Sequence, residues 1–303
     1  MSMAKAKKIK YLITGGLGFI GHNLVKQLQS QKHDVQVIDA LTTYNVIDAK
    51  ELEDLYNQRL KQININTQIY KEDICTPELD TVFENFKPDV VVHLASFPRE
   101  AAVKANPIEA ARTMCVGTAN LLDCAKRHNT KKFVYVSTGK YEDKDNADGQ
   151  YSIWKIAGEE LVKQNGVPYV IVRPGQVYGP RNISTDLIGN YFKKANSKDT
   201  LYVNGASHDL IYVDDCVAGI IQATGANNKT YNISLITKSI KEKDIADKII
   251  KIVKQGKIKE KAHLNHKNYE LDCSAAKKEL KFAPNITIDK GLKLYHDWLK
   301  STS

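Results

Sequence analysis

Three glycines near the start of the chain restrict its fold more than any other feature. They stand in residues 14–21 (TGGLGFIG), directly after the apolar segment 9–14. Gly15 allows a sharp turn, Gly18 lets the backbone approach a diphosphate, and Gly21 lets a helix pack closely on the preceding strand. This spacing predicts a strand, a phosphate-binding turn and a helix in succession, as at the start of a dinucleotide-binding fold.

An acidic residue follows at the distance at which such a fold contacts the adenosine ribose. Asp39 ends the next expected strand, 34–39, and its carboxylate can accept hydrogen bonds from the ribose. A carboxylate repels a 2′-phosphate, and the two residues after it include no arginine. We therefore expect NAD rather than NADP. Its diphosphate would face the first turn of the helix, at Gly18, Phe19 and Ile20.

Short β-branched segments alternate with amphipathic ones in the first half of the chain. The expected strands are 9–14, 34–39, 68–71, 90–94, 133–137 and 169–173, and the expected helices are 23–28, 110–127 and 156–163. This alternation predicts an α/β fold, a Rossmann-type doubly wound parallel sheet. After Pro174 the pattern degrades, which indicates a smaller C-terminal substrate-binding lobe with helices near 241–253 and 288–299.

Charge and cysteine content argue against several classes of protein. There are 44 Lys and Arg against 35 Asp and Glu, a net charge of +9, but the lysines are scattered and form no stripe for nucleic acid. The five cysteines are dispersed without a CxxC pair, so we expect no metal site. Dispersed, unpaired cysteines also suit a reducing compartment. No segment resembles a signal sequence or a membrane span. We expect a cytoplasmic protein that binds neither nucleic acid nor membrane.

A tyrosine and a lysine form the second chemical signal. On a helix, Tyr151 and Lys155 share one face, and the cation stabilises a phenolate, so that the tyrosine pKa moves from about 10 toward neutrality. Such pairs also occur by chance on solvated helices. Here the pair follows a strand that ends at the hydroxyls of Ser137 and Thr138. Ligands bind at the carboxyl ends of parallel strands, so this pair is a candidate acid–base pair.

Taken together, the motifs resemble the extended short-chain dehydrogenase/reductase superfamily, in particular its NAD-dependent nucleotide-sugar epimerase/dehydratase family, and are UDP-glucose 4-epimerase-like. The resemblance covers nearly the whole chain. Its matching stretches are 14–21 (TGGLGFIG), 73–74 (DI), 92–96 (VHLAS), 117–122 (GTANLL), 173–180 (RPGQVYGP), 211–215 (IYVDD) and 272–280.

The resemblance implies a catalytic trio of Tyr151, Lys155 and either Thr138 or Ser137. Tyr151 would take a proton from a sugar hydroxyl at C4 while NAD⁺ accepts hydride from the same carbon, and hydride return to the other face would complete epimerisation. Lys155 would bind the nicotinamide ribose. The remaining cofactor contacts implied are Asp73, Ile74, Leu94, Ala95 and Ser96.

The same resemblance implies two domains with different functions. An NAD-binding domain would comprise 1–175 and 212–238, and a substrate-binding lobe 176–211 and 239–303. Helices around 110–127 and 152–164 would pair two copies of the chain as a homodimer.

Departures from the family pattern bear on the reaction. Thr138 is followed by Gly139 and Lys140 where 4,6-dehydratases carry Asp-Glu, so dehydration is not expected. The segment 138–151 is short, and the usual asparagines are replaced by Cys115 and Gln176. Two arginines that hold the diphosphate in epimerases are replaced by His208 and by a residue near His266 or Lys267. The candidate substrate ligands are therefore Gln176, Arg181 and His208, with Lys193 and Lys194.

Three functions remain open at this point. The first is a nucleotide-sugar epimerase, an isomerase of carbohydrate metabolism. The second is an NAD-dependent reductase or dehydrogenase, an oxidoreductase of the same superfamily that acts on another carbonyl or sugar substrate. The third is a non-catalytic NAD-sensing regulator, against which the Tyr151 and Lys155 pair argues.

Overall fold

The computed structural model describes residues 8–42, 47–139, 149–261 and 270–302. Lys140, His266 and Lys267, which the sequence singled out, lie outside these residues. The chain divides into two compact units. The first comprises residues 1–137, 148–172 and 224–230, and the second comprises 138–147, 173–223 and 231–303. The functional domain limits expected from the sequence stay a prediction.

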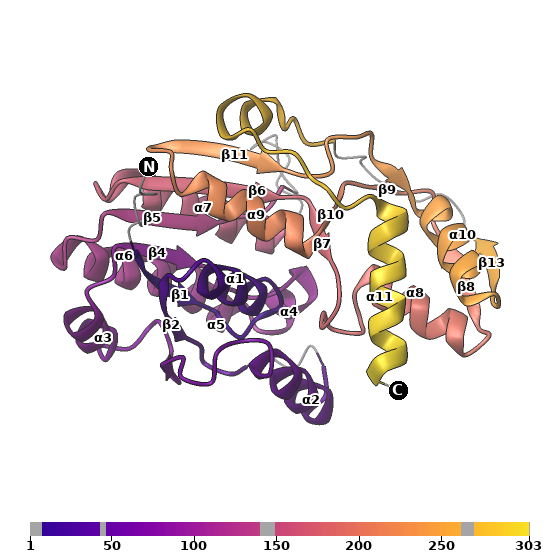
Figure 1. The fold of residues 1–303 in the computed structure, drawn as a ribbon, viewed down its shortest axis with the longest axis horizontal. Coiled ribbons are helices and arrows are strands. Elements are labelled where there is room, and N and C mark those ends of the chain that lie inside the picture. Colours follow the sequence, from indigo (N-terminus) through magenta and orange to yellow (C-terminus); the bar gives the residue numbers. More distant parts are fainter. Residues whose placement is uncertain (1–7, 43–46, 140–148, 262–269, 303) are drawn as a thin grey trace, which may run out of the picture. The chain divides into compact units, whose positions relative to one another are not determined.

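A seven-stranded sheet with the order β11-β6-β5-β4-β1-β2-β3 forms the centre of the fold (Figure 1). Its strands are β1 (Lys10–Thr14), β2 (Asp34–Ile38), β3 (Ile69–Tyr70), β4 (Val90–His93), β5 (Lys132–Val136), β6 (Tyr169–Pro174) and β11 (Lys229–Ile233). The pairs β1–β2, β1–β4, β2–β3, β4–β5 and β5–β6 are parallel. The predicted Rossmann-type sheet is confirmed, and six of its strands lie within a residue or two of the expected segments.

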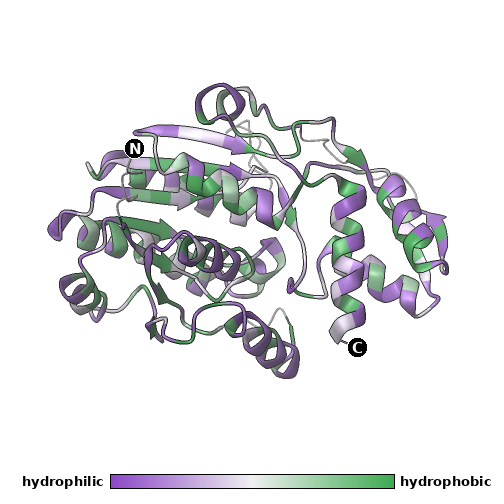
Figure 2. Ribbon diagram, viewed as in Figure 1, coloured by the Kyte–Doolittle hydropathy of each residue, from purple (hydrophilic) through white to green (hydrophobic). Residues whose placement is uncertain are grey.

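The helices of the first unit connect successive strands of this sheet. They are α1 (Phe19–Ser30), α2 (Ala49–Leu60), α3 (Leu79–Phe86), α4 (Glu100–Ala105), α5 (Pro107–Ala111), the π-helix η1 (Arg112–Gly117), α6 (Thr118–Arg127) and α7 (Gln150–Gln164). Helices α3, α6 and α7 pack side by side, and their apolar residues join those of β4 and β5 in one buried cluster. Figure 2 shows the central strands as hydrophobic and the helices as two-sided. The sequence placed one helix at 110–127, whereas a π-helical turn interrupts it in the structure.

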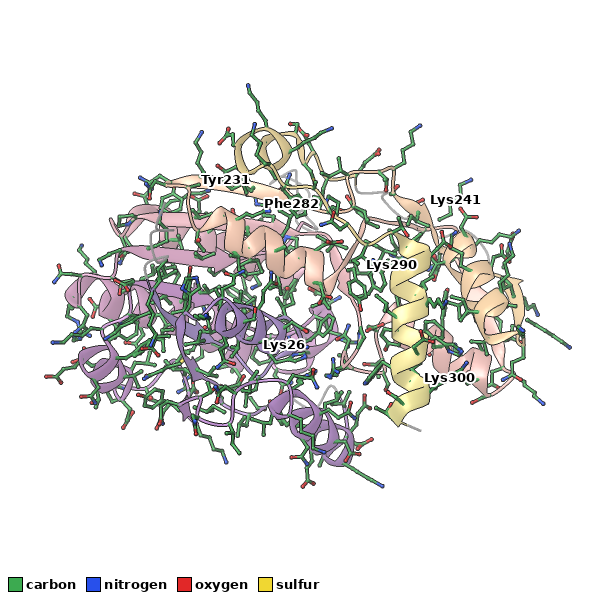
Figure 3. All side chains as sticks on the ribbon, viewed as in Figure 1. Lys26, Tyr231, Lys241, Phe282, Lys290 and Lys300 are labelled. Carbon is green, nitrogen blue, oxygen red and sulfur yellow. The ribbon has the colours of Figure 1, made fainter. Side chains whose placement is uncertain are left out.

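The second unit is built from short strand pairs and helices. Its pairs are β7 (Gln176–Tyr178) with β10 (Leu210–Tyr212), β8 (Thr200–Val203) with β13 (Lys257–Glu260), and β9 (Ser207–His208) with β12 (Ile240–Lys241). Its helices are α8 (Leu187–Asn196), α9 (Val213–Ala223), α10 (Glu242–Val253), the π-helix η3 (Ala276–Leu280) and α11 (Ile288–Thr302). Buried Tyr231 donates a hydrogen bond to Glu279 and thereby joins β11 to η3 (Figure 3).

Exposed lysines, apolar helices and possible metal ligands were located among the residues that the structure describes. The labelled lysines in Figure 3 are exposed and come from three elements: Lys26 from α1, Lys241 from β12, and Lys290 and Lys300 from α11. Within the described ranges, no helix has the length and apolar character needed to cross a membrane. The same ranges contain no group of three His, Cys, Asp or Glu residues that could hold a metal ion.

Candidate active site and cofactor site

The glycine turn has the close backbone contacts that the sequence predicts. Gly15 has a φ of +69°, and a Cβ there would lie 2.7 Å from the backbone nitrogen of Ala95. A Cβ on Gly21 would lie 2.1 Å from the Gly15 oxygen, so α1 packs directly on the turn. Gly18 donates its N–H to the Gly15 oxygen at 3.0 Å and precedes α1. A side chain at Gly15 or Gly21 would therefore clash with the backbone that forms this turn, so both positions require glycine.

The carboxylate of Asp39 is fixed at the end of β2. Its Oδ2 accepts the N–H of Leu17 and its Oδ1 accepts the N–H of Leu41, both at 2.9 Å. Burial raises the pKa of Asp39, while these two bonds and the charge of Arg59 oppose the rise. Arg59 is itself buried on α2 and donates to the Leu17 oxygen at 3.0 Å. Sequence analysis missed Arg59 because α2 was not among its expected helices.

A chain of hydrogen bonds runs from the end of β1 to α6 through His93. Thr118 Oγ1 donates to the Met114 oxygen at 2.8 Å, so it accepts a hydrogen bond from the N–H of His93 Nε2 at 3.0 Å. His93 Nδ1 must then accept from Thr14 Oγ1 at 2.7 Å. Thr14 Oγ1 in turn accepts the N–H of Ala95 at 3.3 Å. The segment after β4, with the predicted cofactor residues Leu94, Ala95 and Ser96, is thus attached to the glycine turn.

The predicted cofactor contacts Asp73 and Ile74 are held by the π-helix and α6. Asp73 Oδ2 accepts from Arg112 Nη1 at 3.2 Å. Asn120 Nδ2 donates to the Ile74 oxygen at 2.9 Å. A Cβ on Gly117 would lie 2.6 Å from the Ile74 side chain, so this glycine is needed for the close approach.

Tyr151 lies in the first turn of α7 and is partly exposed. Its backbone N–H donates to Glu100 Oε2 at 2.8 Å, and its ring packs against the cluster that contains Phe97 and Met114. Burial raises the pKa of Tyr151 to about 12. This direction is opposite to the lowering toward neutrality that the sequence predicts, because burial disfavours the charged phenolate.

Lys155 is buried on the same helix, with 4% of its surface exposed. Its Nζ donates to the Val136 oxygen at 2.9 Å and lies 5.2 Å from the centre of the Tyr135 ring. Burial lowers the pKa of Lys155 to about 8, and the charge of Glu159 opposes that fall. The ammonium is thus held at the carboxyl end of β5, where the sequence predicts chemistry.

The two candidate hydroxyls after β5 are both buried. Ser137 belongs to the first unit, and its N–H donates to the Val172 oxygen at 2.8 Å. Thr138 belongs to the second unit, where it lines a cavity of about 110 Å³. That cavity is lined by Thr138, Gly139, Pro174, Gly175, Gln176, Ser207, His208, Asp209 and Leu271.

Gln176 and His208, two of the predicted substrate ligands, meet in this cavity. His208 Nδ1 lies 3.0 Å from Gln176 Oε1 and donates to it, because an amide oxygen only accepts. The backbone of β7 is held by the residue between β9 and β10, since Gln176 donates its N–H to the Asp209 oxygen at 2.7 Å. The other predicted ligands, Arg181, Lys193 and Lys194, are not among the lining residues. Arg181 follows β7 with a φ of +65°.

The cavity also explains the residue after Thr138. A Cβ on Gly139 would lie 2.4 Å from Leu271 Cδ1 and 3.0 Å from the Pro174 oxygen. Leu271 is held there because its N–H donates to Asp209 Oδ2 at 2.8 Å. Leu271 and Asp209 had no local signal in the sequence, since their contact joins segments 62 residues apart.

Comparison with known proteins agrees with this geometry. Residues 11–234 match the model of the NAD dependent epimerase/dehydratase family. A putative UDP-glucose 4-epimerase of Methanocaldococcus jannaschii is 27% identical over 96% of this chain and 99% of its own length. A dTDP-D-glucose 4,6-dehydratase of Dictyostelium discoideum is 30% identical over 80% of this chain, and the match spans 62% of that protein. The crystal structure of the Bordetella bronchiseptica enzyme WbmF with NADH has a TM-score of 0.81 and 26% identity, covering 99% of this chain and 94% of that one.

The fold and the site define an NAD-dependent enzyme of the extended short-chain dehydrogenase/reductase type. The chain belongs to the NAD dependent epimerase/dehydratase family. Its own residues fit the cofactor, because the glycines keep the turn before α1 tight and Asp39 presents a fixed carboxylate beside that turn.

Proposed function

We propose that the protein is an NAD-dependent nucleotide-sugar epimerase that acts at C4 of the sugar. The observation that carries this proposal is the packing of Gly139 beneath Leu271 and Pro174. Family dehydratases carry an acid at this position, and here a side chain has no room. The Tyr151 and Lys155 pair is intact, so the chain retains the groups for oxidation and reduction but lacks an acid there for loss of water.

In the proposed reaction the protein places and moves a proton. Tyr151 removes the proton from the C4 hydroxyl and returns it after the 4-keto sugar has presented its other face. Lys155 favours the phenolate form of Tyr151 by its charge, and Thr138 holds the sugar oxygen. Bound NAD⁺ supplies the hydride acceptor and a further positive charge. Gly15, Gly18, Phe19, Ile20, Gly21, Asp39, Asp73, Ile74, Leu94, Ala95 and Ser96 would hold it, together with Tyr151 and Lys155.

Substrate binding is proposed for the cavity of the second unit. Gln176 and His208 offer an amide and an imidazole there, in place of the asparagine and arginine of related epimerases. Arg181 is the proposed partner for a phosphate. An imidazole offers a phosphate fewer hydrogen bonds than a bidentate guanidinium does, so we expect weaker substrate binding than an arginine would give.

We also propose a homodimer and a cytoplasmic location. The homodimer is supported by exposed apolar side chains on neighbouring elements: Ile108 on α5, Val116 on η1, and Ile153 and Leu161 on α7. A reducing compartment such as the cytoplasm is supported by the five cysteines, all of which are free.

The purified protein tests the epimerase proposal directly. On unfolding it should release NAD in near-equal molar amount, because an epimerase recycles its cofactor in place. Incubation with UDP-glucose and other nucleotide sugars, followed by proton NMR, should show inversion at C4. Tyr151→Phe should abolish turnover and keep bound NAD, whereas Tyr70→Phe, a matched loss of a hydroxyl on β3, should leave turnover unchanged.

Other outcomes would overturn the assignment in distinct ways. A protein that is empty when purified and oxidises or reduces a substrate with added NAD(H) would be a dehydrogenase. A protein that binds NAD but turns over no sugar nucleotide would fit the regulator. Unchanged epimerisation by Tyr151→Phe would mean that the base is another residue.

A further inference from the structure

The ammonium of Lys155 is surrounded by buried groups to which the proposed reaction gives no role. Its Nζ donates to the Val136 oxygen at 2.9 Å and lies over the Tyr135 ring, 5.2 Å from its centre. A cation at this distance from an aromatic face is stabilised electrostatically, and the effect grows when water is excluded. Lys155 has 4% of its surface exposed, and Tyr135 has 2%.

Packing against two elements holds the Tyr135 ring in place. On one side is α7, where a Cβ on Gly158 would lie 2.1 Å from the Tyr135 hydroxyl oxygen. The hydroxyl end of the ring therefore lies directly on the helix backbone, three residues after Lys155. His93 on β4 also contacts it, with ring centres 5.6 Å apart. A larger residue at 158 would displace the ring from beneath the ammonium.

Glu159 follows Lys155 by one helical turn and has 1% of its surface exposed. Its Oε2 lies 3.9 Å from the Nζ of Lys163, one turn further along. Residues four apart on a helix are neighbours, so Lys155, Glu159 and Lys163 form a ladder of alternating charge along α7. A buried carboxylate is costly unless charged neighbours compensate it, and a lysine one turn away on each side can supply that compensation.

The other titratable groups around Lys155 carry no charge near pH 7. Burial, aided by the charge of Lys155, lowers the pKa of His93 to about 3. Burial raises the pKa of Tyr135 well above its ordinary value and that of Tyr151 to about 12. The carboxylate of Glu159 is the charge that opposes the fall in the Lys155 pKa.

We propose that Tyr135 and Glu159 are positioning residues that keep Lys155 protonated and directed at the carboxyl end of β5. The face of the Tyr135 ring stabilises the ammonium, and the Glu159 carboxylate supplies a compensating charge one turn away. This inference rests on the proposed function for the role of Lys155 in turnover. The protonation of Lys155 itself can be measured without turnover, so the two proposals fail separately.

The direct test is a pH titration of Lys155 by NMR in protein labelled with ¹³C at the lysine side chains. Lys155→Arg identifies the resonance. In Glu159→Gln, which preserves volume, Lys155 should lose its proton about 1 pH unit lower than in the unmodified protein. Lys163→Gln is the matched control on the same helix. It removes a cation from the neighbourhood of Glu159, so the pH at which Lys155 loses its proton should stay the same or rise.

The Tyr135 variants separate the ring from its hydroxyl. Tyr135→Phe keeps the ring, so the midpoint of the Lys155 titration should stay within a few tenths of a pH unit of that in the unmodified protein. Tyr135→Leu removes the ring and should lower that midpoint. In the enzyme assay, Glu159→Gln should move the alkaline limb of the kcat profile to lower pH by the same amount and leave KM nearly unchanged.

An unchanged Lys155 titration in folded Glu159→Gln would overturn the proposal for the carboxylate, and equal titrations in Tyr135→Phe and Tyr135→Leu would overturn it for the ring. If Tyr135→Leu does not fold, Tyr135→Met, which keeps more of the volume, takes its place. If no sugar nucleotide is turned over, the NMR result still decides the inference while the proposed function fails.

Discussion

Glu100 and Tyr151 are joined by a hydrogen bond of 2.8 Å from the backbone N–H of Tyr151 to Glu100 Oε2. The other carboxylate oxygen accepts the N–H of Gln150 at 3.1 Å. Glu100 stands on α4 and therefore caps the N-terminus of α7 from another helix, where a negative charge is favourable. Gly149, with a φ of +98°, leaves the space, because a Cβ there would lie 2.5 Å from the Glu100 carboxyl carbon. The position of the candidate base thus depends on a residue 51 positions earlier.

Removing this cap should weaken both stability and turnover. Glu100→Ala should lower the free energy of unfolding by about 1–2 kcal/mol, the usual effect of losing a helix cap, and should lower kcat more than it changes KM. Urea denaturation and steady-state kinetics measure the two effects. Lys104→Ala is the control, because Lys104 lies 3.5 Å from Glu100 in an exposed ion pair that should contribute little. Equal effects of the two variants would contradict the capping role.

Buried His93 should make stability depend on pH. Its pKa is lowered to about 3 in the folded protein, so only the unfolded chain takes up this proton as the pH falls below about 6.5. The unfolded state is then favoured, and the free energy of unfolding should decrease from pH 6.5 to pH 5 by roughly 1.5 kcal/mol on account of this residue.

His93→Gln isolates that contribution, because glutamine keeps polar atoms but does not titrate. Urea denaturation of both proteins at pH 7 and pH 5 should show a smaller loss of stability for the variant. The same loss in both would mean that His93 is protonated in the folded protein or that other groups dominate.

The packing of Gly139 predicts a coupling with Leu271. Gly139→Ala should cost about 1–3 kcal/mol, because the new methyl group meets the Leu271 side chain and the Pro174 oxygen. The double variant with Leu271→Ala should lose less stability than the sum of the losses in the two single variants, since the shorter side chain makes room for the new methyl group. Thermal unfolding of the four proteins completes the cycle. Strict additivity would show that the crowding lies elsewhere.

The proposed homodimer places apolar residues of α7 and η1 at an interface. Ile153 is 49% exposed and Val116 is 57% exposed, so a charge at either site should not disturb the fold of one chain. Ile153→Glu combined with Val116→Glu should shift sedimentation from dimer to monomer. Ile65→Glu, at a 96% exposed residue between α2 and β3, is the control and should leave the dimer intact. A monomer in the unmodified protein would contradict the proposal at once.

The elements predicted from the sequence with most success are those in which local spacing carries the information. The glycines of residues 14–21 act on neighbours within one turn, and Gly15 has the positive φ that its place requires. Tyr151 and Lys155 both belong to α7, since a spacing of four follows from the helix itself. The parallel sheet could be predicted from the apolar segments that alternate with helical ones, because a continuous apolar segment indicates a buried strand.

Tertiary structure alone decided the environments of those residues. Glu100 reaches Tyr151, Arg59 reaches Leu17, and Leu271 covers Gly139, all across 42 or more residues and without any periodic pattern. The pKa of Tyr151 moved against the expected direction for the same reason. A neighbour at fixed spacing can be read from the chain, but desolvation depends on which distant segments exclude water, and only the assembled fold determines that.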